Sequence, residues 1–206
     1  LVGPGLGVEA ITGEFLRLLL GSRAAARRQP IGFAVSPIEA QSAALPPMVL
    51  DADALNLLSR RGEWWRDMPA DCVLTPHPGE MARLLGCEIG AVQAQRIETA
   101  RSAAQRWGCT VVLKGAYTVV ATRDGRATLI PFANPALATA GTGDVLAGVI
   151  VGLMAQGLCG YDAAICGAYL HALAGELWSQ QHGNSGMLAG ELLSRLPVAR
   201  QRVYGG

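Results

Sequence analysis

Short apolar runs alternate with helical segments along this chain of 206 residues, and this alternation limits the possible folds more than any other feature. The runs MVL, CVL and TVVL are apolar almost without interruption. Such runs are typical of strands that helices bury on both faces, as in parallel sheets. The sequence therefore predicts an α/β fold with three layers, α/β/α, and a mainly parallel central sheet.

Apolar periodicity and turn residues predict the remaining elements. The spacing of Ile11, Phe15, Leu18 and Leu19 predicts a first helix. The pair Asp124-Gly125 predicts the turn of a β-hairpin in YTVVATRDGRATLIP. Further helices are expected at about 80–85, at 91–107, from residue 144, at about 162–180 and, as a short helix, up to about residue 196.

Two segments fall outside this regular pattern. Residues 29–47 contain four prolines and no clear period, which predicts a loop or a surface insertion. The chain also opens on Leu1-Val2, which looks like the end of a strand, and it has no initiator Met. We expect residues 1–206 to form a single domain that is the C-terminal portion of a longer protein, truncated at its N-terminus.

Composition argues against two functional classes. Half of the residues are apolar, 16% are charged and the net charge is +1, so we expect no binding to nucleic acid or to a membrane surface. The most apolar run, 145–155, is too short to span a bilayer. The five cysteines are odd in number and form no C-x-x-C pair, a pattern typical of reduced thiols in a cytoplasmic protein.

Polar or glycine-rich clusters follow the predicted strands. In parallel sheets, ligands bind along the edge formed by the carboxyl ends of the strands. Several such clusters at one edge indicate a single site, and their glycines indicate a ligand that carries phosphate. The clusters are GPGLG, DAD, TPHPGE, KG and AGTGD.

The AGTGD cluster combines an anion site with an acid. Backbone N–H groups of Gly141, Thr142 and Gly143 can bind phosphoryl oxygens at the start of a helix. Asp144 would repel a phosphate as a passive neighbour, but it suits a base that removes a proton from an attacking hydroxyl. The alternative is that Asp144 simply caps its helix.

The other clusters permit both functional and structural interpretations. Lys114, followed by Gly115, can contact nucleotide phosphates or lie free on the surface. Glu80 can hold Mg²⁺ through water or complement the helix dipole, and His77, between two prolines, can contact a ligand or be solvated. In DAD, one aspartate can orient a metal or a loop while the other caps the next helix.

Taken in order, these stretches resemble the ADP/ATP-dependent NAD(P)H-hydrate dehydratases of the ribokinase-like superfamily. GTGD alone indicates the superfamily, whereas TPHPGE together with DADALN indicates the dehydratases. The resemblance extends from Leu1 to about Leu196, although an N-terminal part of the family domain has no counterpart here. The matching stretches are VGPGLG, VLDADALNLL, TPHPGEMARLLG, VVLKGAYTVV and NPALATAGTGDVLAG.

The resemblance implies a metabolite-repair lyase that uses ADP or ATP with Mg²⁺ to return hydrated NADH or NADPH (NADHX, NADPHX) to the normal cofactor. It also implies a homo-oligomer and an epimerase that is fused or separate. Asp144 would deprotonate the substrate hydroxyl for attack on the terminal phosphoryl group, and elimination of phosphate would follow. Substrate contacts are expected at Gly5, His77 and Asp144, and nucleotide contacts at Lys114, Gly115, Ala116, Tyr117, Thr118, Gly141, Thr142 and Gly143.

Two other functions compete with this interpretation. A ribokinase-like kinase for a sugar or a hydroxymethylpyrimidine would use the same Asp144 but stop at the phosphorylated product. A non-catalytic nucleotide-binding remnant is the second alternative, because the N-terminal part of the domain has no counterpart.

Overall fold

The computed structural model describes residues 1–21 and 45–205 of the chain. Most of the segment expected to be a loop or insertion, 29–44, lies outside these residues. The part that is described, 45–47, carries no helix or strand.

The sheet has five strands in sequential order, β1 (Met48–Leu50), β2 (Cys72–Leu74), β3 (Thr110–Leu113), β4 (Val119–Ala121) and β5 (Ala127–Leu129). The first three run parallel, and Val2 adds a parallel bridge to Leu50. The last two are antiparallel and form the expected hairpin, in which Thr122 N–H bonds the carbonyl of Arg126. The sheet is therefore mixed, with its parallel part where the predicted site residues lie.

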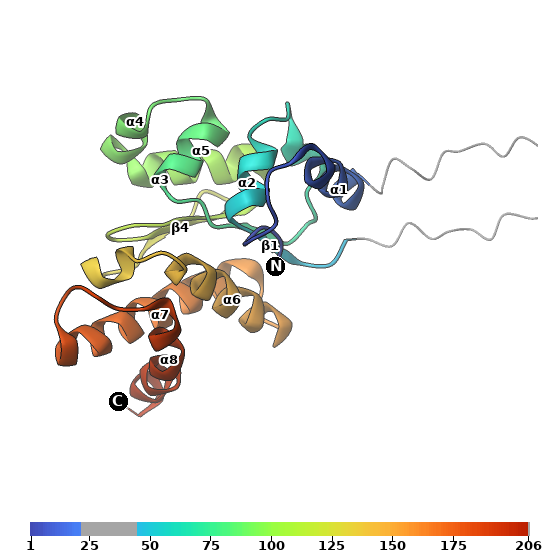
Figure 1. The fold of residues 1–206 in the computed structure, drawn as a ribbon. Helices are drawn as coiled ribbons and strands as arrows, with labels where there is room; N and C mark the ends of the chain where they lie inside the picture. Colours follow the sequence, from blue (N-terminus) through green and yellow to red (C-terminus); the bar gives the residue numbers. More distant parts are fainter. Residues whose placement is uncertain (22–44, 206) are drawn as a thin grey trace, which may run out of the picture.

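Helices cover both faces of this sheet, so the predicted three-layer architecture is confirmed (Figure 1). Helices α1 to α5 lie on one face and α6 to α8 on the other. Their bounds are α1 Ala10–Gly21, α2 Ala52–Leu58, α3 Pro78–Leu85, α4 Ile89–Ala94, α5 Arg96–Trp107, α6 Thr142–Ala155, α7 Gly160–His182 and α8 Ala189–Tyr204, with short 3₁₀ helices at Trp64–Asp67 and Pro135–Ala138.

The strands contribute alternate side chains to two hydrophobic cores. Met48 and Leu50 of β1 pack with α1 to α5, whereas Val49 between them packs with α6 and α7. Both faces of β1 are thus buried, which is why its sequence is apolar at every position.

Several predicted helix boundaries were wrong. The helix expected at 91–107 is two helices, because Gln95 has non-helical dihedral angles of φ −138° and ψ 48°. The helix expected to end near Leu196 continues through Pro197 to Tyr204. Helices α3 and α6 each begin two residues earlier than expected, at Pro78 and Thr142.

Helix α1 exists as predicted, but its expected apolar stripe does not face the core. Ile11 is 81% exposed, and Phe15 and Leu18 are also exposed. Leu16 and Leu20 are fully buried instead. In residues 1–21 and 45–205, no helix combines the length and hydrophobicity that a membrane-spanning segment needs.

Candidate active site

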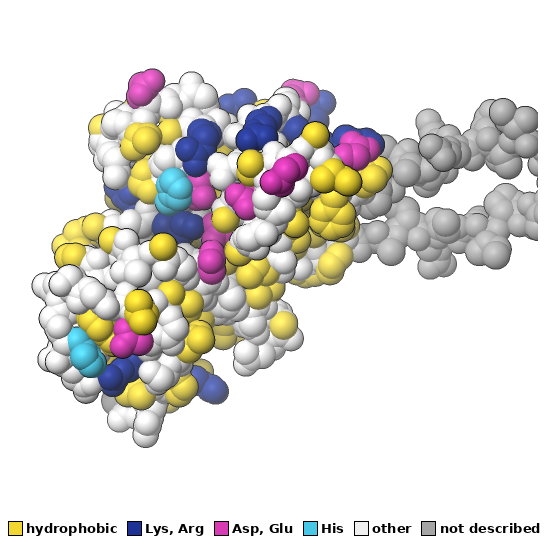
Figure 2. All heavy atoms as spheres, viewed as in Figure 1, with side chains coloured by type: hydrophobic (Ala, Val, Ile, Leu, Met, Phe, Trp, Pro, Cys, Tyr) yellow, Lys and Arg dark blue, Asp and Glu magenta, His cyan; other side chains and the backbone are white. Residues whose placement is uncertain are grey.

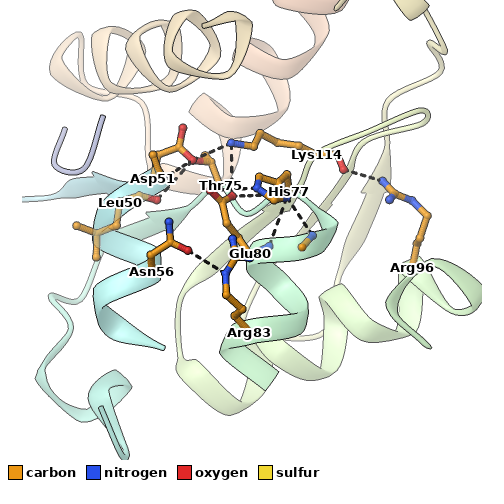
Figure 3. Close-up of polar contacts among 11 residues, drawn as sticks. Leu50, Asp51, Asn56, Thr75, His77, Glu80, Arg83, Arg96 and Lys114 are labelled. Carbon is orange, nitrogen blue, oxygen red and sulfur yellow. Dashed lines mark hydrogen bonds and ion pairs between the residues drawn. The ribbon is translucent and has the colours of Figure 1, made fainter. Parts of the chain in front are cut away.

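An ion pair joins the ends of two parallel strands at the carboxyl edge of the sheet. Lys114 follows β3, and its Nζ lies 2.7 Å from Oδ1 of Asp51, which follows β1 (Figure 3). Glu80 of α3 approaches the same ammonium, with its Oε2 at 3.9 Å. Asp51 is 1% exposed and the Lys114 side chain 17% exposed, so the lysine is not the free surface residue that the sequence left open.

The DAD motif fixes two neighbouring segments. Asp51 caps helix α2, because its Oδ1 also accepts a hydrogen bond from the Ala52 N–H at 2.9 Å. Asp53 Oδ2 accepts the Gly7 N–H at 2.8 Å and so holds the GPGLG loop. One aspartate caps a helix and the other orients a loop, as expected from the sequence.

His77 and Glu80 cap helix α3 reciprocally. Nδ1 of His77 accepts the N–H groups of Gly79 and Glu80 at 3.0 and 3.4 Å, and Glu80 Oε2 accepts the His77 N–H at 2.7 Å. Burial raises the pKa of the Glu80 carboxyl above its ordinary value. Burial and the nearby Lys114 ammonium lower the pKa of His77. Both residues therefore have a structural function, whatever else they contact.

The start of helix α6 forms the opposite wall of the site. Gly141 precedes the helix at φ +88°, a conformation that favours glycine. The Thr142 hydroxyl donates to the carbonyls of Leu137 and Thr139 at 2.7 and 2.8 Å. In the described part of the chain, the N–H groups of Gly141, Gly143 and Asp144 have no acceptor. The N–H of Thr142 is taken by the Thr139 carbonyl, so these three groups are the free donors near the predicted anion site.

Lys114 reaches this second wall as well. A Cβ placed on Gly143 would lie 3.2 Å from Lys114 Nζ. The ammonium therefore lies against the positive end of α6, and both features attract an anion. Asp144 follows on the exposed side and bonds to no other described residue. Figure 2 shows acidic, basic and histidine side chains gathered where the two helical layers meet.

A cavity of about 330 Å³ opens beside this junction. His171 forms part of its wall and supports α6, since its Nε2 lies 2.9 Å from the Thr142 carbonyl oxygen. Burial lowers the pKa of His171 to about 4, so this side chain is neutral and donates to that oxygen. The other lining residues include Lys114, Gly115, Ala116, Thr118, Phe132, Asn134 and Thr142.

Comparison with known proteins identifies the family. Residues 1–198 match the NAD(P)H-hydrate dehydratase family. The chain belongs to this family. A relative from Moorella thermoacetica, a bifunctional NAD(P)H-hydrate repair enzyme Nnr, is 49% identical over 157 residues, which are 76% of this chain and 30% of the relative.

Solved structures agree with this family membership. An ADP/ATP-dependent NAD(P)H-hydrate dehydratase from Bacillus subtilis, co-crystallized with ATP/Mg2+ and soaked with CoA, matches with 38% identity and a TM-score of 0.68 over 76% of this chain. A ribokinase-like superfamily protein from Enterococcus faecalis matches 97% of this chain with a TM-score of 0.71, at 25% identity. The ribokinase-like fold is thereby confirmed. The chain spans only 56% and 62% of these two structures.

The structure brings most of the predicted dehydratase site residues to one edge. Lys114 contacts Asp51, lies close to His77 and Glu80, and abuts Gly143 next to Asp144. A Cβ on Gly5 would meet no atom within 4 Å, so the GPGLG loop is open to solvent there.

Tyr117 does not share the cavity of its neighbours. It lies with Ile97 and Leu129 along a separate groove of about 480 Å³. Its backbone has φ +54°, and its N–H donates to the Phe132 carbonyl at 2.8 Å. Gly141 and Gly143 are likewise absent from the cavity wall, although Thr142 between them is part of it.

Sequence reasoning missed Arg96 entirely. Its guanidinium contacts the carbonyls that flank the Lys114 turn. The only sequence signal was the position of an arginine on the helix that precedes VVLKG, and no motif marked it.

Proposed function

We propose that this chain carries out the ADP- or ATP-dependent dehydration of hydrated NADH or NADPH. One observation supports this function above all: the Lys114 ammonium lies against the free N–H groups at the start of α6, with an unpaired carboxylate, Asp144, next to them. This arrangement suits the transfer of a phosphoryl group to a hydroxyl that Asp144 deprotonates.

The proposed reaction has two stages. Asp144 accepts the proton of the substrate hydroxyl, whose oxygen forms a bond to the terminal phosphorus of the nucleotide while the bond between that phosphorus and its bridging oxygen breaks. The Gly143 and Asp144 N–H groups and Lys114 stabilise the charge of the transferring group. Phosphate then leaves the ring carbon as the ring nitrogen donates its electron pair, and a proton lost from the adjacent carbon completes the double bond.

Asp51 and Glu80 suit a magnesium ion held largely through water. Oδ2 of Asp51 is buried and has no partner among the described residues. Glu80 is engaged in the cap of α3, so it suits an outer contact. No group of three or more metal-binding side chains occurs in the described ranges 1–21 and 45–205, consistent with an ion that keeps several waters. When bound, Mg²⁺ would neutralise phosphate charge.

The name of the bifunctional Moorella relative supports a companion epimerase for this function, fused or separate. We also propose a homo-oligomer and a cytoplasmic location, which follow from the family resemblance and the cysteine content.

The test measures NADH recovery from its hydrate by absorbance, with ATP or ADP present. Asp144→Asn should reduce turnover about 10²–10⁴-fold, because the amide cannot accept the proton, while nucleotide binding persists. Asp162→Asn is the matched control, since Asp162 is an exposed acid at the corresponding position of α7. Asp144→Asn activity within about threefold of the parent would contradict the role of Asp144, since a positioned base contributes more than that. A phosphorylated product without phosphate release would indicate a kinase instead.

A further inference from the structure

Arg96 holds the turn that follows β3 and is not among the residues that line the cavity. Its Nη2 donates to the carbonyls of Leu113 and Lys114 at 3.1 and 3.3 Å, and Figure 3 shows the contact with Lys114. Its Nη1 donates to Gln93 Oε1 at 2.8 Å. The break at Gln95 makes Arg96 the first residue of α5. The side chain is about half-buried, and this burial lowers the pKa of the guanidinium.

This contact fixes the direction of the backbone in the turn. In a trans peptide the N–H points opposite to the preceding carbonyl. With the Lys114 carbonyl directed at Arg96, the Gly115 N–H points away from the guanidinium. Gly115 also lines the cavity. The Thr118 hydroxyl holds the next carbonyl, that of Gly115, at 3.0 Å.

Gly115 and Arg96 also fit each other sterically. Gly115 has φ +137°, and a Cβ there would lie 3.2 Å from both Nη atoms of Arg96. A side chain at this position would therefore push the guanidinium back by a few tenths of an ångström and strain the backbone of the turn. Arg96 itself is absent from the cavity wall and lines the separate groove with Tyr117, so it would act on a nucleotide in the cavity through the turn.

We propose that Arg96 is a positioning residue of the nucleotide site: it holds the Lys114–Gly115 turn so that this turn presents Gly115 N–H and the Lys114 ammonium to the nucleotide. The inference deepens the proposed function and rests on it. Arg101 provides a matched control, because it lies on the same helix and donates Nε to a turn carbonyl, that of Gly125, at 3.0 Å.

The experiment measures ADP and ATP binding by calorimetry and steady-state kinetics for the parent, Arg96→Met, Arg96→Lys and Arg101→Met. Arg96→Met should raise the nucleotide Kd and KM about tenfold or more, as expected on losing a hydrogen bond from a charged donor, while KM for the hydrated cofactor stays unchanged. Arg96→Lys should recover part of the affinity, since an ammonium can bond one carbonyl but lacks the planar fork. Arg101→Met should leave nucleotide binding at the parent value.

A second variant disturbs the same contact without removing the arginine. Gly115→Ala should weaken nucleotide binding, because its Cβ crowds the Arg96 guanidinium and its φ of +137° is strained for alanine. If part of this effect passes through Arg96, the loss of affinity in the double variant should be smaller than the sum of the two single losses. If Arg96→Met binds nucleotide as tightly as Arg101→Met, the inference about Arg96 is wrong while the proposed function still stands. A parent protein that binds neither nucleotide would overturn the proposed function and the inference together.

Discussion

The two walls of the site are built in opposite ways. On the wall formed by Asp51, Glu80 and Lys114, the charged groups contact one another and the acids also cap helices. On the wall formed by Gly143 and Asp144, two N–H groups and a carboxylate have no partner in the part of the chain that the structure describes. Apart from Oδ2 of Asp51, which has no partner, the charged groups of the first wall are paired, whereas those of the second are available. In the proposed reaction, the first wall would supply a fixed charge for the phosphates, and the second would supply the free N–H groups and the base.

The largest expected effect is a difference in the free energy of unfolding between two aspartate variants, one on each wall. Asp51→Asn should lower the free energy of unfolding by about 3 kcal/mol, because the largely buried Lys114 ammonium loses its nearer carboxylate and keeps only that of Glu80 at 3.9 Å. Asp144→Asn should change it by about 0.5 kcal/mol or less, as is usual at exposed positions. Urea unfolding of both variants measures the contrast. Equal losses would show that the walls do not differ in this way.

The pH dependence of stability tests how the second wall is supported. His171 has a pKa of about 4 in the folded protein and about 6.5 when unfolded. Its contribution is therefore fully present above about pH 6.5 and is lost as the pH falls toward 4, by about 3 kcal/mol in all.

His171→Gln isolates this contribution, because glutamine can still donate to the Thr142 carbonyl but does not titrate. The difference in unfolding free energy between parent and variant should shrink by about 3 kcal/mol from pH 7 to pH 4. A constant difference across this range would mean that His171 is not held neutral against α6.

The smallest expected effect concerns the backbone before α6. Gly141→Ala should lower the free energy of unfolding by about 1–3 kcal/mol, since Gly141 has φ +88° and its Cβ would lie 3.1 Å from that of Ala189. Gly148→Ala, inside helix α6, is the control, and its effect on the free energy of unfolding should have the opposite sign. No atom lies within 4 Å of its Cβ position, so alanine should stabilise the protein by about 0.5–1 kcal/mol. Thermal unfolding of both variants is the measurement.

The sheet and the edge that carries the site could be predicted because their signals are local. A buried strand is apolar at every position, and the unusual residues follow directly after it, as in VLDAD and VVLKG. The partner of Lys114 could not be predicted, since Asp51 lies 63 residues away in the chain. Only the register of the folded sheet brings the two together.

Other errors have equally physical causes. Periodicity identifies α1 as a helix but does not tell which of its two apolar sides is covered, and the structure buries Leu16 and Leu20 rather than Ile11 and Phe15. The break at Gln95 involves neither Gly nor Pro, so no residue type signals it. The nucleotide contact expected at Tyr117 stays a prediction, although Tyr117 lines a different groove from Gly115 and Thr118 because adjacent residues of a turn face different directions.

The capping contact of His77 also determines its tautomer. Nδ1 accepts two backbone N–H groups, so it carries no proton, and in the neutral ring the proton resides on Nε2. The half-exposed ring directs this Nε2 proton toward the Glu80 carboxylate, since Nε2 lies 3.5 Å from Glu80 Oε1. Both ring nitrogens of His77 thus face groups of helix α3, and a ligand that takes the place of Glu80 at Nε2 would have to present an acceptor.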